Sequence, residues 1–207
     1  MKGLSGQELD TALLEIFADQ RERLAQYLRL PKGAQIILCP SGSDAEYLPV
    51  ALARSLHPSK EIANGITQLN EIGAGSAPAS TGKYFSTHAP FLGKHDNENL
   101  TGFDGISGTT IPARESNGKL INASEKMDKY CTQQLEDKRF PIVHGVFGGK
   151  TGVRDTKMPG SLEAGAKSFG VVDACQGRFS YEEMNSWMNQ NSIVLFTTSK
   201  FYQVRMC

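Results

Sequence analysis

The chain has 207 residues, of which 22 are Lys or Arg and 22 are Asp or Glu, so its formal net charge at pH 7 is zero. A balanced charge argues against a protein that binds nucleic acid by electrostatic attraction. Hydrophobic residues make up 39% of the chain and charged residues 21%, which is typical of globular proteins. No apolar run approaches the roughly 20 residues that span a bilayer, and the first ten residues lack the pattern of a secretion signal. We therefore expect a folded, cytoplasmic protein with neither nucleic acid nor membrane as a partner.

The four cysteines lie far apart in the sequence and form no C-x-x-C pair. They are Cys39, Cys131, Cys175 and Cys207. This spacing predicts free thiols, with neither a disulfide framework nor a metal site.

The first segment, residues 1–33, is predicted to be helical. Ser5 and Glu8 have the spacing of a capping box, and apolar residues then recur at helical intervals as far as Leu28. Pro31 then breaks the pattern. We expect the remainder, residues 34–207, to belong to one domain.

Short apolar runs alternate with helical patterns through residues 34–207. A helix is expected from Asp44 to about Leu56, opened by a second capping box from Ser43 to Glu46 and kinked by Pro49. Strands are expected at residues 35–39, 61–67, 109–114, 140–147, 169–174 and 192–197. Further helices are expected at residues 75–82, 122–135 and 181–189. This alternation predicts an α/β fold with a mostly parallel sheet flanked by helices.

Polar residues follow three of the expected strands. The small-residue turn Gly42, Ser43 and Asp44 could hold a phosphate on its backbone amides, Asp173 ends one strand, and Lys200 follows the last. Carboxyl ends of parallel strands meet at one edge of a sheet, which is where ligands bind. Taken singly, these features also fit a capped turn, a turn acid and a solvated lysine. Taken together, they predict a shared site.

The order of a phosphate turn, a strand-end Asp and a strand-end Lys resembles that of the fold-type I pyridoxal-phosphate-dependent enzymes. The resemblance is closest to the aminotransferase class V and decarboxylase-like branches, and it covers the chain from about Pro40 to Tyr202. It implies a cofactor-binding large domain and a reaction of the transferase or lyase type on an amino acid or amine.

The resemblance also implies a role for each matching residue. Gly42, Ser43 and Asp44 would hold the phosphate of pyridoxal 5'-phosphate, and Asp173 would pair with the pyridine nitrogen. Lys200 would carry the cofactor as a Schiff base.

Five further positions belong to this picture. Gln176 could reach the ring hydroxyl, and Ser199 could bond the phosphate. For stacking on the ring, the candidates are Tyr84, Phe85 and His88, without a choice among them.

The same resemblance implies a homodimer and a chain that continues beyond the lysine. Family members have a further strand and a small C-terminal domain there, whereas this sequence has seven residues after Lys200. Residues 34–207 are therefore expected to be a partial large domain without the C-terminal small domain, and a truncated, non-catalytic remnant is the alternative to an active enzyme.

Two segments resemble nucleotide-binding motifs only in part. Gly149-Lys150-Thr151 is similar to the end of a P-loop, but the position of the motif's first glycine is occupied by His144. A dinucleotide fingerprint starting at Gly73 fails because Pro78 stands where its third glycine should be. A P-loop nucleotide-binding protein is thus the weaker alternative.

Overall fold

A computed structural model describes residues 5–89, 93–94, 98–112, 114–154, 167–190 and 192–197, with only the backbone described at 88, 89 and 94. The helices are α1 (Gly6–Tyr27), α2 (Gly42–Ala45), α3 (Tyr47–Leu56), the 3-10 helix η1 (Leu69–Glu71), α4 (Ser76–Ala79), α5 (Ala123–Glu136) and α6 (Tyr181–Asn189). The strands are β1 (Ile62–Thr67), β2 (His88–Ala89), β3 (Gly93–Lys94), β4 (Ile106–Ile111), β5 (Phe140–Val146), β6 (Phe169–Asp173) and β7 (Ile193–Leu195).

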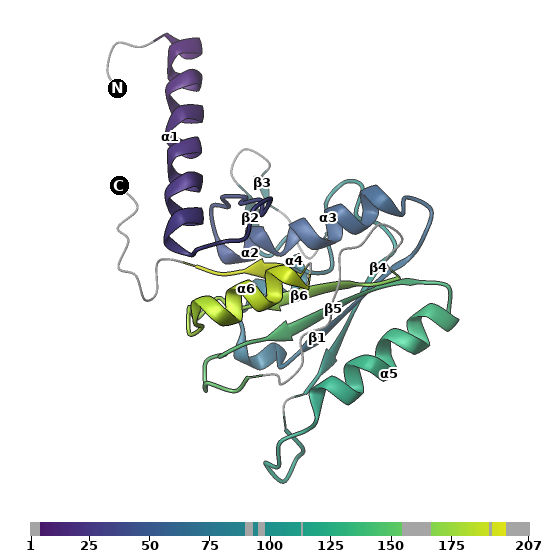
Figure 1. The fold of residues 1–207 in the computed structure, drawn as a ribbon. Coiled ribbons are helices and arrows are strands. Elements are labelled where there is room, and N and C mark those ends of the chain that lie inside the picture. Colours follow the sequence, from purple (N-terminus) through teal and green to yellow (C-terminus); the bar gives the residue numbers. More distant parts are fainter. Residues whose placement is uncertain are drawn as a thin grey trace.

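Five strands form one sheet in the order β4-β1-β5-β6-β7, and every neighbouring pair is parallel (Figure 1). All residues of the central strands β1, β5 and β6 are buried. Burial on both faces is the reason why β5 and β6 are mostly apolar rather than alternating in polarity. The predicted parallel α/β sheet flanked by helices is confirmed.

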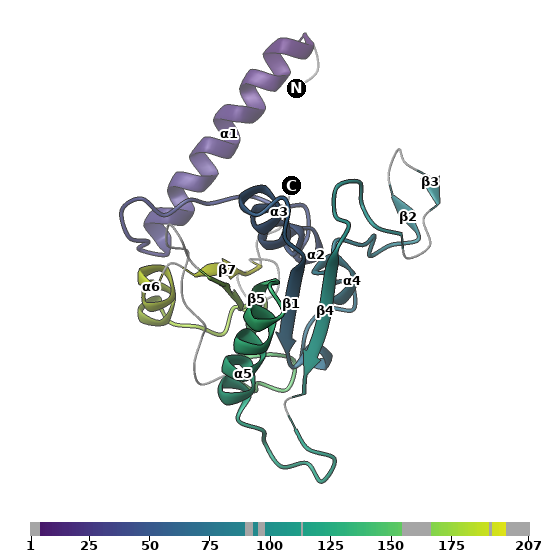
Figure 2. The ribbon, with the colours of Figure 1, turned by 90° about the vertical axis from the view of Figure 1, so that its right-hand side faces the viewer.

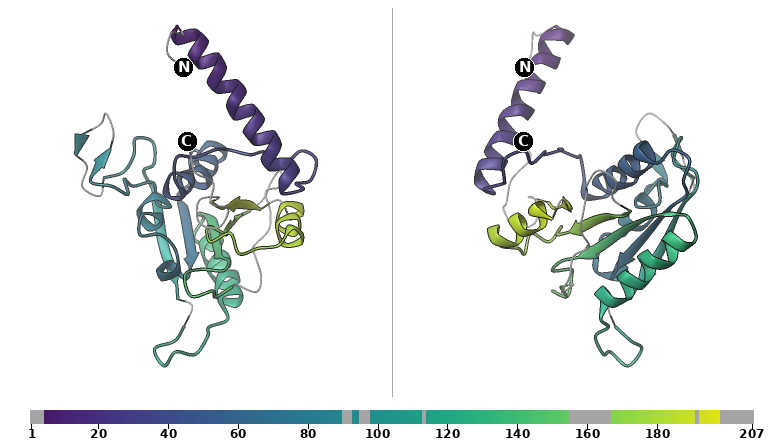
Figure 3. Two further views of the ribbon diagram at one scale, coloured as in Figure 1. Left: turned by 90° about the vertical axis from the view of Figure 1, so that its left-hand side faces the viewer. Right: turned by 45° about the vertical axis from the view of Figure 1, so that its right-hand side comes forward.

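Helices cover both faces of the sheet, as Figure 3 shows for α3 and α5. Alternate residues of a strand point to opposite faces. Ile142 accordingly packs in the cluster that contains Val50 of α3, whereas Val143 packs with Met127 of α5. Trp187 of α6 lies in a third cluster, at the β6 and β7 end of the sheet.

Helix α1 projects away from the sheet (Figure 2), and none of its residues is buried. Its attachment is at its C-terminal end, where Leu28 is buried in the cluster of Trp187 and the ring of Tyr27 meets that of Tyr181 with centroids 6.1 Å apart. Among the helices of the described residues, none is long and apolar enough to cross a membrane.

The predicted starts of α1 and α6 agree with the structure. The capping box of Ser5 and Glu8 opens α1 as expected, and α6 has the bounds that were predicted for it. Helix α5 and strands β1, β5, β6 and β7 lie where they were expected, with ends that differ by one or two residues.

The strand predicted at residues 35–39 is wrong. These residues connect α1 to α2 outside the sheet, and Ile37 and Leu38 are 65% and 38% exposed. An apolar run becomes a strand only where another strand offers its backbone groups, and no such partner lies beside this segment among the described residues.

The helix predicted from Asp44 to Leu56 is two helices. The chain breaks at Glu46, and the cap of α2 is Ser41 rather than Ser43. Pro49 therefore lies in the first turn of α3, where a missing N–H removes no intrahelical bond. The expected kink is replaced by this break three residues earlier.

Two further elements differ from their predictions. Strand β4 covers 106–111 rather than 109–114, because Pro112 cannot donate to a strand ladder. Helix α4 is only Ser76–Ala79, shorter than the predicted 75–82 and followed by Gly82 at a φ of 75°. The small hairpin of β2 and β3 was not predicted.

The loss of an aromatic ring should destabilise the protein much more in the sheet core than on α1. Phe140 is 1% exposed, and its ring stacks on His57 at 4.1 Å between centroids. We expect Phe140→Ala to lower the free energy of unfolding by about 3–5 kcal/mol, because a large side chain leaves a cavity. The matched change Phe17→Ala, on α1, should cost less than about 0.5 kcal/mol. Urea unfolding followed by fluorescence of Trp187, the only tryptophan, measures both, and an equal loss in the two variants would contradict this account of α1.

Candidate active site

The carboxyl edge of the sheet brings together two of the three predicted segments. A Cβ added at Gly42 would lie 3.7 Å from the Sγ atom of Cys175, so the turn before α2 touches the segment after β6. A Cβ added at Gly75 would lie only 2.5 Å from the Oγ atom of Ser43, so the loop before α4 also packs on this turn. The predicted phosphate turn and Asp173 thus belong to one neighbourhood.

The turn at 41–44 is capped by its own side chains. The Oγ atom of Ser41 accepts a hydrogen bond from the Asp44 amide at 3.2 Å and donates one to the Asp44 carboxylate at 2.6 Å. The amides of Gly42 and Ser43, at the start of α2, have no carbonyl partner within the helix. The phosphate role predicted for Gly42, Ser43 and Asp44 stays a prediction; the amide of Asp44 already donates to Ser41 Oγ, and its carboxylate would repel an anion.

Asp173 ends β6 with its side chain 2% exposed. One carboxylate oxygen, Oδ1, accepts the Cys175 amide at 2.9 Å, while Oδ2 is buried without a hydrogen-bond partner among the described residues. A buried carboxylate oxygen without a donor is unfavourable by several kcal/mol relative to water. Asp173 Oδ2 is therefore positioned to accept a hydrogen bond from a ligand.

Two buried polar side chains that the sequence analysis did not select lie beside Asp173. His144 of β5 and Glu46, between α2 and α3, are 0% and 1% exposed, and His144 Nε2 lies 3.2 Å from Glu46 Oε2. One nitrogen of His144 and one oxygen each of Glu46 and Asp173 lie within 4.8 Å of one another. We call these three residues the buried triad. The signal that could have revealed it is a histidine in the middle of the apolar run Phe140–Phe147.

The register of the sheet explains why two members of the triad meet. Asp173 pairs with Val146, and His144 precedes Val146 by two residues, so both side chains point to the same face. That face is the one that α3 covers, and Glu46 directly precedes α3. The triad consequently sits between the sheet and the start of α3.

Burial sets the protonation of the pair. It raises the pKa of Glu46 well above its usual 4.5, and the charge of Asp173 raises it further, against a smaller opposing effect of the Ser76 hydroxyl. Burial lowers the pKa of His144 to about 4, although the charge of Asp173 opposes the change. Burial thus disfavours the charged form of both members of the pair.

The open space beside Asp173 is small. A cavity of about 20 Å³ is lined by Asp173, Gln176 and Phe147, among others. Sites for small ligands measure about 300–1,000 Å³. One wall is held by Glu71, whose carboxylate accepts the amide of Thr151 at 2.6 Å and its hydroxyl at 2.8 Å. The cavity in this structure is therefore too small for a ring-sized ligand.

The Glu71 contact also bears on the P-loop alternative. The loop Gly148–Thr151 binds a carboxylate of its own chain through Thr151, and residues 152–154 after it are not helical. A P-loop instead presents its amides to phosphates at the start of a helix.

The remaining predicted residues have different outcomes. Gln176 lines the same cavity as Asp173. Ser199 and Lys200 lie outside the described residues, as does the side chain of His88. Of the other stacking candidates, Phe85 is beside the turn, because a Cβ added at Gly75 would meet its ring at 3.2 Å.

The types of donor and acceptor at this edge match those of a phosphorylated pyridine, although the cavity of about 20 Å³ is too small to hold one in this structure. Two turn amides suit a phosphate, and the partnerless oxygen of Asp173 suits a protonated ring nitrogen. Comparison of the chain with protein-family models, with curated proteins and with solved structures finds no match. The site must therefore be interpreted from its own geometry.

The protonation of Glu46 predicts how stability changes with pH. Its folded-state pKa is above the unfolded value of 4.5, so the folded protein binds the extra proton above that pH, and the folding equilibrium weakens as pH rises. Glu46→Gln keeps the shape and removes this titration. The folding constant of the variant relative to wild type should then increase about tenfold per pH unit above 4.5, until the folded-state pKa is reached.

Urea unfolding across this pH range, followed by Trp187 fluorescence, measures the ratio. His144 titrates in the opposite sense, because its folded-state pKa of about 4 lies below 6.5 and its contribution is lost as pH falls through that interval. Both proteins contain His144, so its effect cancels to first order. A ratio that stays constant with pH would mean that Glu46 is ionised in the folded protein.

Proposed function

We propose that this chain binds pyridoxal 5'-phosphate at the carboxyl edge of its sheet and acts on an amino acid or amine. The observation that carries the proposal is Oδ2 of Asp173, a buried carboxylate oxygen at the end of a central parallel strand with no hydrogen-bond partner among the described residues. Such an acceptor is satisfied by a buried N–H donor, and a protonated pyridine nitrogen is one that also carries the complementary charge.

Asp173 would keep the ring nitrogen protonated. When bound, the cofactor supplies an aldehyde that condenses with amines and a ring that accepts electrons from the substrate carbon. The ring accepts electrons well only while its nitrogen carries a proton, and a nearby carboxylate favours that charged form. The backbone bond from Cys175 to Oδ1 fixes the carboxylate so that Oδ2 remains the atom available to the ligand.

The other end of the cofactor would lie on the turn before α2. The amides of Gly42 and Ser43 would donate to the phosphate, with Ser199 as a further donor from its place in the sequence. A side chain at Gly42 would approach Cys175, so a small residue keeps the turn close to the Asp173 segment. Gln176, on the cavity wall beside Asp173, would donate to the ring hydroxyl.

Lys200 would hold the cofactor covalently and serve as the base at the substrate carbon. Desolvation can lower the pKa of a lysine ammonium, and the resulting neutral amine is both a nucleophile and a proton carrier. The reaction type would be that of a transferase or lyase. We further propose a cytoplasmic homodimer, and the alternative to an active enzyme is a non-catalytic remnant of one.

Cofactor binding should depend on Asp173. Titration of the purified chain with pyridoxal phosphate should give saturable binding, visible as a new absorbance band. Asp173→Asn should weaken binding by about tenfold to one hundredfold, the usual effect of losing a hydrogen bond to a charged group. The matched control is Asp137→Asn, at the exposed end of α5, which should bind like wild type. Equal affinity in all three proteins would contradict the role of Asp173.

Covalent attachment should depend on Lys200. After reduction with borohydride, the added phosphopyridoxyl mass should lie on the peptide that contains Lys200, and Lys200→Ala should leave binding that reduction does not fix. Label on Lys150 or Lys83 instead would exclude the assignment. A wild-type chain that neither binds nor is labelled would favour the remnant.

A further inference from the structure

We propose that the buried triad binds a divalent metal ion of the Zn²⁺ type, with one nitrogen of His144 and one carboxylate oxygen each of Glu46 and Asp173 as its ligands. This inference goes beyond the proposed function and does not depend on it. Both ligands would use Asp173, so the ion and the cofactor would exclude each other there. None of the three residues is a cysteine, which is why the spacing of the cysteines did not reveal the site.

The first argument is the set of polar atoms that the fold leaves without hydrogen bonds. Both carboxylate oxygens of Glu46, both ring nitrogens of His144 and Oδ2 of Asp173 are buried without a hydrogen-bond partner of good geometry among the described residues. Their neighbours on this face, such as Ile142 and Val171, are apolar. The large majority of buried polar side-chain atoms in native proteins have a partner, and an ion or a water accounts for many of the exceptions. Five such atoms in one cluster therefore point to a ligand.

The second argument is distance. His144 Nε2 lies 3.2 Å from Glu46 Oε2, and the three candidate ligand atoms all lie within 4.8 Å of one another. Two ligand atoms bonded to one Zn²⁺ ion at about 2.0–2.2 Å are about 3.3–3.6 Å apart in a tetrahedron. His144 and Glu46 thus have nearly the spacing of two ligands of one ion, and an oxygen of Asp173 is close enough to be the third.

The third argument is the chemistry of the donors. One imidazole and two carboxylates form a mixed nitrogen and oxygen set, which suits Zn²⁺ and similar first-row ions. Ca²⁺ and Mg²⁺ are bound instead by sets of oxygen ligands. Three protein ligands leave one position of a tetrahedron for a water molecule. The cavity of about 20 Å³ that Asp173 lines has room for one water.

The fourth argument is charge. Buried charges in proteins are paired with opposite charges or bind metals. The charge that acts on both Glu46 and His144 is that of Asp173, which is negative, so it gives Glu46 no compensation. A divalent cation would balance two carboxylates beside a neutral imidazole. Binding would release any proton on Glu46, because metal ligands are deprotonated.

The ligands belong to three different elements. His144 lies in β5, Asp173 ends β6, and Glu46 directly precedes α3. An ion bonded to all three would join two central strands to the start of the helix that covers them. Since the unfolded chain does not hold these groups together, binding should stabilise the folded state.

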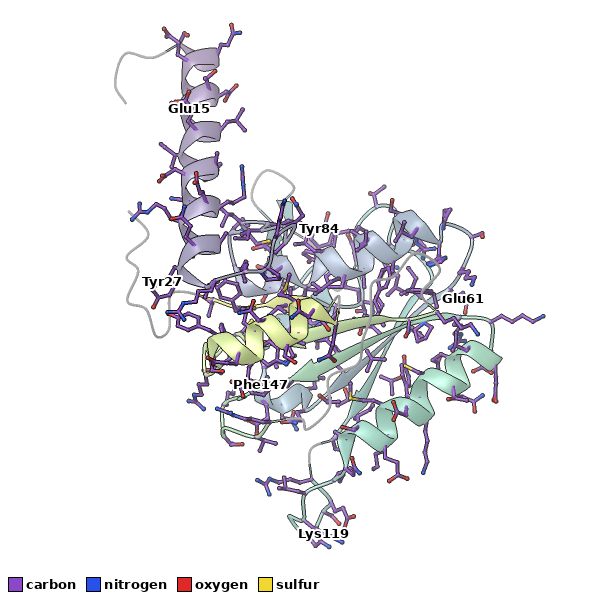
Figure 4. The ribbon with its side chains drawn as sticks, viewed as in Figure 1. Glu15, Tyr27, Glu61, Tyr84, Lys119 and Phe147 are labelled. Carbon is purple, nitrogen blue, oxygen red and sulfur yellow. The ribbon has the colours of Figure 1, made fainter. Side chains whose placement is uncertain are left out.

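Titration of the full chain with Zn²⁺, after removal of metal by a chelator, tests the inference. Glu46→Gln and His144→Phe each remove one ligand and keep the approximate size of the side chain. The control is Glu61→Gln, because Glu61 lies at the end of the sheet opposite Phe147 (Figure 4) and forms an exposed ion pair with Arg139. Calorimetry gives the dissociation constant, and the shift of the melting temperature with Zn²⁺ shows whether the ion binds the folded state.

We expect wild type to bind one Zn²⁺ ion and to melt at a higher temperature as the Zn²⁺ concentration rises. Glu46→Gln and His144→Phe should each weaken binding by at least about one hundredfold, because the loss of an outer partner of a metal ligand already costs about 10–100-fold. Glu61→Gln should bind like wild type. A wild-type chain that binds no Zn²⁺, or a folded Glu46→Gln protein that binds it like wild type, would overturn the inference.

X-ray absorption of the wild-type zinc complex needs no variant to fold. The spectrum should contain one imidazole and only nitrogen or oxygen neighbours at about 2.0–2.2 Å, whereas sulfur at about 2.3 Å would assign the ion to cysteines and overturn the inference. Zn²⁺ binding of the expected kind by a chain that binds no pyridoxal phosphate would refute the proposed function alone. Cofactor binding that depends on Asp173, without Zn²⁺ binding, would refute this inference alone.

Discussion

The burial of three ionisable side chains against the α3 face of a parallel sheet is the constraint on which this structure depends. Glu46, His144 and Asp173 are each at most 2% exposed, and every neighbouring element has to be placed so that water stays out. Exclusion of water is the main reason why the pKa of Glu46 is above that of an ordinary carboxylate. The same exclusion makes the free oxygen of Asp173 a strong acceptor for one well-placed donor.

The parallel sheet supplies the geometry that the triad and the site share. Since β5 and β6 run side by side in the same direction, a histidine two residues before the end of one strand and an aspartate at the end of the other face the same side. Because the chain breaks between α2 and α3, Glu46 lies against the α3 face of the sheet, and the amides of Gly42 and Ser43 lie at the sheet's edge. Residues 42–46 thus supply both the proposed phosphate site and the Glu46 side chain of the buried triad.

Local chemistry allowed much of the fold to be predicted from the sequence. The helix Tyr181–Asn189 has a capping box at its start, and the strand Phe169–Asp173 is an apolar run that ends in a polar residue. Predictions failed where the outcome depends on distant partners. Residues 35–39 have strand composition but no strand beside them among the described residues. The side chain of Ser43, the predicted cap, instead packs against Gly75.

The candidate site was predictable to the same extent. Asp173 and the turn could be selected because strand ends in a parallel sheet converge. Glu46 and His144 could not be paired, because they are 98 positions apart in sequence and meet only through the packing of α3 on the sheet.

A diffraction structure of the chain grown with pyridoxal phosphate tests the central claim most directly. The account predicts a ring nitrogen within about 2.7–3.2 Å of Asp173 Oδ2 and density continuous with Lys200 Nζ. A cofactor bound elsewhere, with Asp173 Oδ2 making no contact to it, would contradict the account.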